Sequence, residues 1–543
     1  MRAHVRVSQL CFAWPDGTPV FDGLSFTLDA RRTGLVAPNG AGKSTLLRLL
    51  AGTLTPASGH VEIAGSLAWL PQDLVFPNAM RVADVLGVRE RLDALAAIAA
   101  GRMEQGLFDM VGDAWDLEER TRASLARFGL DHLALDRALA SLSGGEVMAL
   151  GLAAQWLKQP DVLLLDEPSN HLDAAARQRL HRFIDDWPGC LLVASHDRAL
   201  LERMDQIAEL DRESLRMYGG NFTFYEAAVR AQADAAEQDV RNLRQAARRE
   251  HRERQQSRER SERRASNARR GVDDAGLPRI VAGNRARSAQ VSAARSDDVH
   301  AARAADAAQR LAVARRSIRE APDLLIELPD TQVPPGKWLF SGQALQVVHD
   351  GAALFAPGGI DLDIRGPERI VIAGGNGAGK TTLARLVSGE LAPDAGSVRR
   401  GEGRVARLSQ RLESFDAGET VMGCFAACTP ALDDVERANL LARWLFRGTA
   451  MHRPVAALSG GERLRIHLAC TLHATPAPQL LVLDEPTNNL DLWAVRELER
   501  ALRAYRGALV VISHDAAFVD AIAPTRRLAL EHGRLVERVV VDA

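Results

Sequence analysis

Short apolar runs that end in polar loops occur twice along the chain, in the same order. Residues 34–37 and 370–373 each lead into a glycine-rich loop and then into a helical pattern. The later runs 163–165 and 480–483 are apolar at every position, which is typical of parallel strands buried on both faces. We therefore predict two α/β domains, each with a parallel sheet flanked by helices.

Both domains carry the same set of motifs. In the first domain these are Gly-Ala-Gly-Lys at 40–43, Gln72, Ser-Gly-Gly-Glu at 143–146, Asp-Glu-Pro at 166–168 and Ser-His-Asp at 195–197. In the second they are Gly-Ala-Gly-Lys at 377–380, Gln410, Ser-Gly-Gly-Glu at 459–462, Asp-Glu-Pro at 484–486 and Ser-His-Asp at 513–515. One such loop can arise by chance, but this matched order predicts two nucleotide-hydrolysing domains.

The glycine loops are the expected ATP sites, because consecutive backbone amides at a helix N-terminus cradle phosphates. The expected binding residues are Asn39, Gly40, Ala41, Gly42, Lys43, Ser44 and Thr45 in the first loop, and Gly374, Gly375, Asn376, Gly377, Ala378, Gly379, Lys380, Thr381 and Thr382 in the second. Ala37 stands where the second loop has Gly374. If that position needs a positive φ, Ala37 is expected to be strained.

Acidic residues at the ends of the apolar strands, with nearby polar residues, predict how Mg²⁺ is held and how the attacking water is activated. We expect Mg²⁺ to be held by Ser44, Gln72 and Asp166 in the first domain and by Thr381, Gln410 and Asp484 in the second. Glu167 and Glu485 are placed to act as general bases on the attacking water, and His196 and His514 to contact the γ-phosphate and orient the base.

The Ser-Gly-Gly-Glu segments precede helical patterns and offer a second anion site in each domain. The residues concerned are Ser143, Gly144 and Gly145 in the first copy and Ser459, Gly460 and Gly461 in the second. Neither segment can fold onto the phosphate loop of its own domain.

Composition, the length of the apolar runs and the cysteine content indicate which classes of protein fit this sequence. The chain has 543 residues, of which 46% are hydrophobic and 25% charged, and its apolar runs are strand-sized. They fall short of the ~20 residues of a membrane span, and the N-terminus shows no secretory pattern. Five scattered cysteines favour a reducing, cytoplasmic location, with Cys424 and Cys428 expected to be ordinary buried thiols.

The segment between the two domains is basic. Residues 226–320 contain 22 Arg, no Lys and 14 acidic residues, on a chain whose net charge is −2. Residues 226–270 predict one long helix, with a break at Gly271, Gly276 and Pro278, and a second helical stretch follows at about 288–320. A projecting helical hairpin that binds a polyanion and a solvated charged spacer both fit this pattern.

The first domain is longer than the second. Gln72 and Ser143 are 71 residues apart, whereas Gln410 and Ser459 are 49 apart, which leaves 22 extra residues between positions 81 and 137. A longer helical subdomain and a short projecting insertion are both compatible with this excess.

The motifs of both domains resemble the ATP-binding-cassette superfamily, whose signature is Ser-Gly-Gly-Glu. The resemblance implies two cassettes that hold two ATP molecules head to tail. One site would join Lys43, Ser44, Gln72, Asp166, Glu167 and His196 to Ser459 and Gly461, and the other Lys380, Thr381, Gln410, Asp484, Glu485 and His514 to Ser143 and Gly145. It also implies that Trp14 stacks on adenine, whereas the second domain has Val348-His349 at that place.

Tandem cassettes joined by a charged helical linker are similar to the ABC-F branch of that superfamily. Asp-Glu-Pro-Ser-Asn-His-Leu-Asp (166–173) and Asp-Glu-Pro-Thr-Asn-Asn-Leu-Asp (484–491) carry this resemblance. It implies an ATPase that binds the ribosome, both rRNA and tRNA, through the linker, in translation or in antibiotic protection. We expect a monomer without stable membrane association, with cassettes at 1–225 and 322–543 and the linker at 226–321.

Two other classes of function are alternatives. The energising subunit of a membrane transporter needs a membrane partner and gives the Arg-rich linker no role. A DNA-repair or chromosome ATPase usually has far longer coiled coils or zinc-binding cysteine clusters, which this sequence lacks.

Overall fold

The computed structural model describes residues 4–72, 74, 77, 80–170, 172–211, 213–274, 299, 301–303, 305–312, 326–349, 351–408, 416, 418–488 and 490–538. Its contacts divide the chain into two compact units. Met1–Thr223 and Leu324–Ala543 form the first unit, and Phe224–Asp323 form the second. Apart from two residues at each end of the linker, both predicted cassettes lie in the first unit. The three-part division of the chain stays a prediction.

A six-stranded sheet forms the centre of the first cassette, in the order β5-β6-β7-β3-β8-β9. Neighbouring strands are parallel except for β9, which is antiparallel to β8. The strands are β5 (Leu67–Leu70), β6 (Val162–Asp166), β7 (Cys190–Ala194), β3 (Arg32–Val36), β8 (Gln206–Leu210) and β9 (Leu215–Gly219). Every residue of β6 and β7 is buried, which is why these runs are apolar throughout.

The second cassette repeats this sheet in the order β16-β17-β18-β14-β19-β20, again with an antiparallel last strand. Its strands are β16 (Arg404–Leu408), β17 (Pro478–Asp484), β18 (Ala508–Ile512), β14 (Arg369–Gly374), β19 (Arg526–Glu531) and β20 (Arg534–Arg538). The predicted α/β class with two repeated domains is confirmed.

Smaller antiparallel sheets complete each cassette, in the orders β2-β1-β4, β13-β10-β15 and β11-β12. They consist of β1 (Val5–Ala13), β2 (Pro19–Leu28), β4 (Ser58–Ile63), β10 (Trp338–Gln346), β11 (Val348–His349), β12 (Ala352–Ala353), β13 (Ile360–Arg365) and β15 (Ala395–Arg400). Burial alternates along β13, so one face of that strand packs on the core and the other is solvated.

Helices flank both central sheets. In the first cassette these are α1 (Lys43–Leu50), α6 (Gly144–Lys158), α7 (Ala174–Asp185) and α8 (Arg198–Leu201). The second has α11 (Lys380–Ser388), α14 (Gly460–Leu472), α15 (Leu492–Ala504) and α16 (Ala516–Ala521). Both α1 and α11 start at the loop lysine, directly after a left-handed glycine. The phosphate loops therefore lie between a strand and a helix, as their motif requires.

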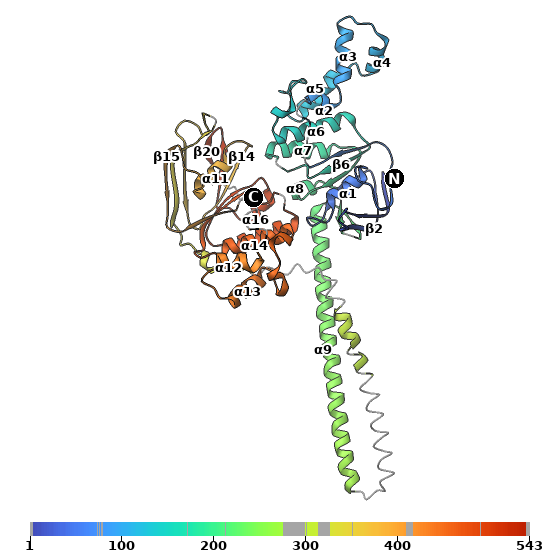
Figure 1. The fold of residues 1–543 in the computed structure, drawn as a ribbon, viewed down its shortest axis with the longest axis vertical. Helices are drawn as coiled ribbons and strands as arrows, with labels where there is room; N and C mark the ends of the chain where they lie inside the picture. The colour runs from blue at the N-terminus through green and yellow to red at the C-terminus, as the bar shows by residue number, and fades with distance from the viewer. Residues whose placement is uncertain are drawn as a thin grey trace. The chain divides into compact units, whose positions relative to one another are not determined.

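The extra residues of the first cassette form a pair of helices. That cassette has α2 (Val82–Leu86), α3 (Arg89–Ala99), α4 (Gln105–Val111), α5 (Leu117–Arg127) and η1 (Leu139–Ser141). The second has α12 (Val421–Cys428), α13 (Asp434–Arg443), η2 (Pro329–Thr331), η3 (Gly448–His452) and η4 (Val455–Ala457). Each helical part contains an isolated β-bridge, Arg81–Ala138 in the first cassette and Thr420–Pro454 in the second. The two helical parts therefore correspond to each other. We assign the excess to α3 and α4, which pack on each other at one end of the first cassette (Figure 1).

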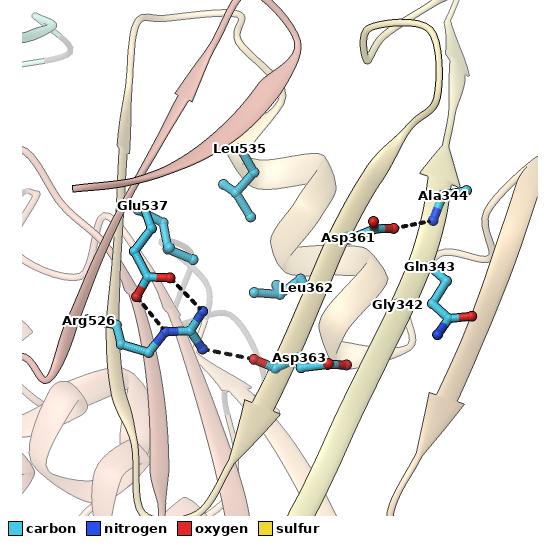
Figure 2. Close-up of a pocket in the computed structure, with 10 residues that line it drawn as sticks. Gly342, Gln343, Ala344, Asp361, Leu362, Asp363, Arg526, Leu535 and Glu537 are labelled. Carbon is cyan, nitrogen blue, oxygen red and sulfur yellow. Dashed lines mark hydrogen bonds and ion pairs between the residues drawn. The ribbon is translucent and has the colours of Figure 1, made fainter. Parts of the chain in front are cut away.

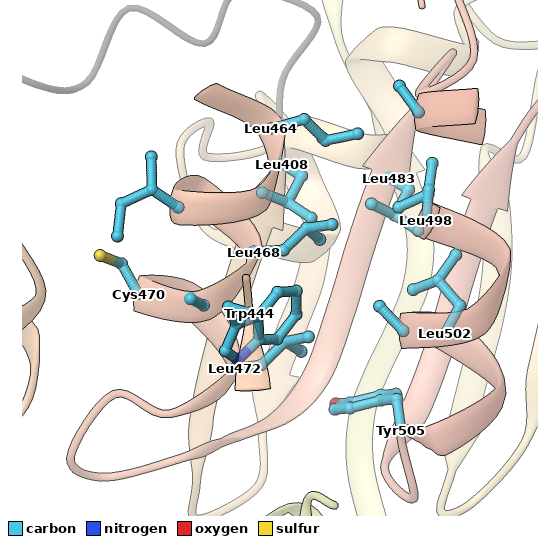
Figure 3. Packing of buried hydrophobic residues seen from close by; sticks show 14 of the residues in the cluster. Leu408, Trp444, Leu464, Leu468, Cys470, Leu472, Leu483, Leu498, Leu502 and Tyr505 are labelled. Carbon is cyan, nitrogen blue, oxygen red and sulfur yellow. The ribbon is translucent and has the colours of Figure 1, made fainter. Parts of the chain in front are cut away.

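The helical part of the second cassette is built around a closed apolar cluster (Figure 3). Trp444 is 1% exposed and lies in the cluster with Leu468 and Leu472 of α14. Tyr505 is equally buried, and its hydroxyl donates to the carbonyl oxygen of Pro478 at 3.1 Å. The cluster also contains Leu481 and Leu483 of β17, so it ties this part to the strand that ends at Asp484.

Replacing Trp444 by Ala should remove the largest side chain of this cluster. We expect the free energy of unfolding of the second cassette to fall by about 3–5 kcal/mol, because the cavity cannot fully collapse. Urea unfolding followed by circular dichroism measures the change. Trp115 is 56% exposed, so Trp115→Ala should stay within about 0.5 kcal/mol of the parent. Equal effects of the two changes would contradict the packing shown here.

The basic linker begins with α9 (Phe222–Asp274), one continuous helix of 53 residues (Figure 1). Pairs four residues apart support it, including Arg241–Glu237 at 3.1 Å and Arg249–Glu253 at 2.9 Å. The predicted break at Gly271 is wrong, because the helix continues through this residue to Asp274. A single glycine costs a helix only about 1 kcal/mol relative to alanine, which good helix formers upstream offset.

The second helical stretch of the linker is described only in part. Residues 299, 301–303 and 305–312 are helical, within the predicted range 288–320. Gly276 and Pro278 lie outside the described residues. Across the part of the chain that the structure describes, no helix has both the length and the apolar character to cross a membrane. Cys424 is buried and Cys428 is half-buried, and both are free thiols.

Candidate nucleotide sites

The first phosphate loop, residues 37–45, depends on two left-handed glycines. Gly40 and Gly42 have φ values of 80° and 100°. A Cβ atom on Gly42 would lie 2.7 Å from a methyl carbon of Val20 and 2.8 Å from the ring of Phe21. Both the backbone conformation and the space therefore require glycine at position 42.

The second loop, residues 374–382, has the same geometry. Gly377 and Gly379 have φ values of 76° and 100°. A Cβ atom on Gly379 would lie 3.0 Å from the side chains of Leu354 and Phe355. The two loops thus present their amides in the same way, ahead of α1 and α11.

The two loops differ at their first position. Gly374 has φ 158°, and a Cβ atom there would lie 2.6 Å from the carbonyl oxygen of Leu530. Ala37 is fully buried, and its φ is not positive. The expected strain at Ala37 is therefore not found, because the first loop has an ordinary backbone conformation at this residue.

Each loop lysine folds back over its own loop. The Lys43 Nζ donates to the Ala37 carbonyl oxygen at 3.0 Å, and the Lys380 Nζ donates to the carbonyl oxygens of Gly374 and Gly375 at 2.7 and 2.9 Å. Burial lowers the pKa of both lysines, and nearby carboxylates, Glu167 and Glu485 first among them, partly oppose this. Two buried ammonium groups thus stand over amide-rich loops, which is an arrangement that suits a bound polyphosphate.

The strand-end acids lie beside these lysines. Asp166 ends β6 and Asp484 ends β17, and both side chains are buried. Glu167 and Glu485 follow with φ 46°, an uncommon value for a residue that carries a side chain. The pKa of Glu167 is raised to about 8 and that of Glu485 to about 7, mainly by burial. Carboxyl groups whose pKa lies near neutrality suit general-base chemistry.

Each histidine approaches the glutamate of its own cassette. The distance from Nε2 to the glutamate Oε1 is 3.5 Å for His196 and 3.4 Å for His514. Burial lowers the pKa of His196 to about 3 and that of His514 to about 4. Both rings are therefore neutral at pH 7. The Nε2 of His196 also lies 2.7 Å from the Lys43 Nζ, and it accepts a hydrogen bond there because the ammonium group can only donate.

The Ser-Gly-Gly-Glu segments form capping boxes at the starts of α6 and α14. The Ser143 amide donates to Glu146 at 2.8 Å, and the Glu146 amide donates to the Ser143 hydroxyl at 3.3 Å. Ser459 and Glu462 make the same two bonds at the same distances. The boxes fix the first turns of helices whose N-termini attract anions.

Contacts link the first loop to the second signature segment. The Asn39 backbone amide donates to the Asp491 carboxylate at 2.8 Å, and Asp491 caps α15. A Cβ atom on Gly460 would lie 3.9 Å from the Asn39 side-chain nitrogen. In addition, the nearly buried pair Arg198–Glu499 joins the two cassettes at 2.8 Å. The structure thus places the loop that carries Lys43 next to the segment that begins at Ser459.

Arg177 is a residue that the sequence analysis missed. It lies on α7 and pairs with Asp197 at 3.3 Å. After burial, its positive charge is the main influence on the pKa of Glu485 in the other cassette, which it lowers. Arg177 stands four residues after Asp173 in the first cassette. The second cassette has Val495 four residues after Asp491, so the two sites differ at this position. Comparing the two copies position by position would have found this difference.

The remaining predicted site residues lie around these groups. Ser44 is half-buried and Thr381 is exposed, each one residue after the loop lysine. Trp14 follows β1 and stacks edge-on against Phe12, with ring centroids 5.2 Å apart. Val348 is 50% exposed. Gln72 follows β5, whereas Gln410 lies outside the described residues.

One hollow of the second cassette lies away from all these motifs. It measures about 550 Å³ and is lined by residues of β10, β13, β19 and β20 (Figure 2). Three of its charged side chains have partners within the protein: Arg526 donates to Glu537 at 2.9 Å and to the Asp363 carbonyl oxygen at 3.0 Å, and Asp361 accepts from the Ala344 amide at 2.7 Å. We therefore assign it no role in nucleotide binding.

Two phosphate loops, each with a lysine, a strand-end Asp-Glu pair and a histidine, define a tandem nucleotide-binding ATPase. Residues 21–170 and 358–488 match the ABC transporter family. The chain is 34% identical over 510 residues to the tylosin resistance ATP-binding protein TlrC of Streptomyces fradiae, with 89% of each chain covered. It is 30% identical over 532 residues to the energy-dependent translational throttle protein EttA of Mycobacterium tuberculosis, covering 92% of this chain and 86% of the relative.

Solved structures agree on the fold. The archaeal ribosome recycling factor aABCE1, in complex with the stalk protein aP1, matches with a TM-score of 0.53 and 19% identity over 97% of this chain and 89% of that one. The chain belongs to the ABC transporter family and, within it, to the ABC-F subfamily of tandem-cassette ATPases.

Proposed function

We propose that this protein is an ATPase that binds the ribosome and uses ATP binding to position its Arg-rich linker against RNA. It acts in translation or in protection from an antibiotic. The observation that carries the proposal is a long arginine-rich helix inserted between two complete ATPase cassettes. The names of the relatives support it, since one is a translational throttle and one confers resistance to tylosin. A cytoplasmic monomer is part of the proposal.

Each nucleotide site would use groups already described. The loop amides and the lysine bind the β- and γ-phosphates, and the signature segment of the other cassette closes the site. The glutamate accepts a proton from the attacking water, and the backbone amide of the histidine donates to that carboxylate, at 3.3 Å from His196 to Glu167, and orients it. The neutral histidine ring would contact the γ-phosphate. Trp14 would stack on adenine in the first site.

The residues present fit a divalent cation. Asp166 and Asp484 are buried carboxylates at strand ends, and the helix after each phosphate loop carries a hydroxyl residue at its second position. Ser44, Gln72 and Asp166 would hold Mg²⁺ in the first site, and Thr381, Gln410 and Asp484 in the second. When bound, the ion neutralises phosphate charge.

The linker has a chemistry that suits RNA. Arg244, Arg248 and Arg252 are exposed and four residues apart on α9, so they lie on one face of the helix. Arginine pairs bidentately with phosphate and stacks on exposed bases. A transporter subunit would leave this face without a role.

Replacing Arg244, Arg248 and Arg252 together by Gln should weaken ribosome binding and leave ATP binding intact. Removing one arginine–phosphate pair should reduce the slope of log K against log salt by about 0.7–0.9, so the triple variant should reduce it by about 2–3. Co-sedimentation with ribosomes over a series of potassium chloride concentrations measures this slope.

Three exposed arginines on cassette strands, Arg6, Arg399 and Arg534, provide a control with the same change in charge. Replacing them by Gln should leave the salt slope near that of the parent. If the two triple variants behave alike, the linker is not the RNA contact, and association with membrane vesicles instead would favour the transporter alternative.

A further inference from the structure

In the second cassette, the strand-end carboxylate of Asp484 is paired with an arginine of the neighbouring strand. Arg407 lies on β16, and its Nη2 is 3.2 Å from the Asp484 Oδ2. The other terminal nitrogen of Arg407 bonds Glu390. The side chains of Arg407 and Asp484 are only 9% and 7% exposed, whereas Glu390 is 49% exposed. Glu390 therefore holds the outer side of the guanidinium while its inner side faces the carboxylate.

The first cassette has no such cation at the matching position. Arg407 pairs with Val482 in the sheet, two residues before Asp484. The same register in the first cassette pairs Trp69 with Leu164, two residues before Asp166. Trp69 is half-buried and packs against the apolar core of that cassette. Thr53 stands where the second cassette has Glu390, at the same spacing from the loop lysine. The difference therefore involves both Arg407 and its outer partner Glu390.

A fixed positive charge beside a metal-binding carboxylate has two effects. It disfavours a second cation on that carboxylate, since like charges a few ångströms apart repel strongly where water is scarce. It also offsets part of the phosphate charge when nucleotide enters without a metal. Both effects reduce the advantage that Mg²⁺ gives to nucleotide binding.

We propose that Arg407 acts as a built-in cation at the Mg²⁺ site of the second cassette, so that ATP binding there depends less on Mg²⁺ than in the first. This inference rests on the proposed role of Asp484 in holding Mg²⁺. The two ATP sites then differ in metal dependence, and at low free Mg²⁺ the site with Lys380 keeps nucleotide when the site with Lys43 loses it.

The test measures binding of a fluorescent ATP analogue, mant-ATP, with Mg²⁺ and with EDTA. Full-length Lys43→Ala leaves the second site, and Lys380→Ala leaves the first. We expect the ratio of Kd in EDTA to Kd in Mg²⁺ to be smaller for the second site, on the order of tenfold. Arg407→Met in the Lys43→Ala background should raise the ratio by about the same factor, whereas Arg407→Lys, which keeps the charge, should change it little.

Arg404→Met is the matched control, since Arg404 lies on the same strand and donates to the Pro476 carbonyl oxygen at 3.4 Å. Its ratio should equal that of the parent. Equal ratios at the two sites of the parent, or an unchanged ratio in a folded Arg407→Met, would overturn the role of Arg407 and leave the ATPase proposal standing. If Mg²⁺ improves binding at neither site, the assignment of the metal to Asp166 and Asp484 is itself wrong.

Discussion

Replacing both Glu167 and Glu485 by Gln is expected to hold the protein on the ribosome with ATP bound. Loss of the general base should slow hydrolysis by about 10²- to 10⁴-fold. Glutamine keeps the size of the side chain and avoids a buried carboxyl group, so ATP binding should persist. Sucrose-gradient sedimentation with ATP measures the fraction of protein that travels with ribosomes, and a phosphate-release assay measures hydrolysis.

The control for this experiment adds Lys43→Ala and Lys380→Ala to the double variant. Both lysines are buried over the loops, and without them the phosphates lose their main positive charge. This quadruple variant should stay at the top of the gradient. If the double variant also stays there while binding ATP, the ribosome proposal is wrong. If it sediments equally well without nucleotide, ATP does not control the association.

Gly461→Asp is expected to stop hydrolysis at the site that contains Lys43, although the two residues belong to different cassettes. An aspartate at the start of α14 places a negative charge where the γ-phosphate is expected. Two like charges about 4 Å apart at an effective dielectric constant of about 20 repel by about 4 kcal/mol, which corresponds to roughly 10³-fold. The helix itself tolerates the change, because an acidic residue in its first turn is favourable.

The matched variants make this test specific. A Cβ atom at Gly461 would lie 3.8 Å from the Ala494 Cβ, which is an ordinary contact, so Gly461→Ala should keep most of the activity. In a Glu485→Gln background only the first site hydrolyses ATP. There Gly461→Asp should abolish activity, whereas Gly145→Asp should leave most of it. The reverse pattern would show that each signature segment serves its own cassette.

Local pattern was sufficient to predict the strands and helices that carry the motifs. Wholly apolar runs such as that of β6 can be satisfied only by a strand buried on both faces. The phosphate loops follow from glycines that alone tolerate φ near 100° before a helix. The linker helix was predicted from its composition, but its extent beyond Gly271 was not, because the local cost of one glycine does not decide where a long helix ends.

The sequence by itself determined that the chain has two cassettes and that the linker is basic, and it predicted which residues carry the nucleotide chemistry. Those properties are local, since they depend on residue type and short spacing. Only the tertiary structure decided that Asn39 meets Asp491, that Arg407 pairs with Asp484, and that burial raises the pKa of Glu167 to about 8. Such contacts join residues far apart in the chain, and strand register and packing set them, because these alone fix which side chains share one desolvated space.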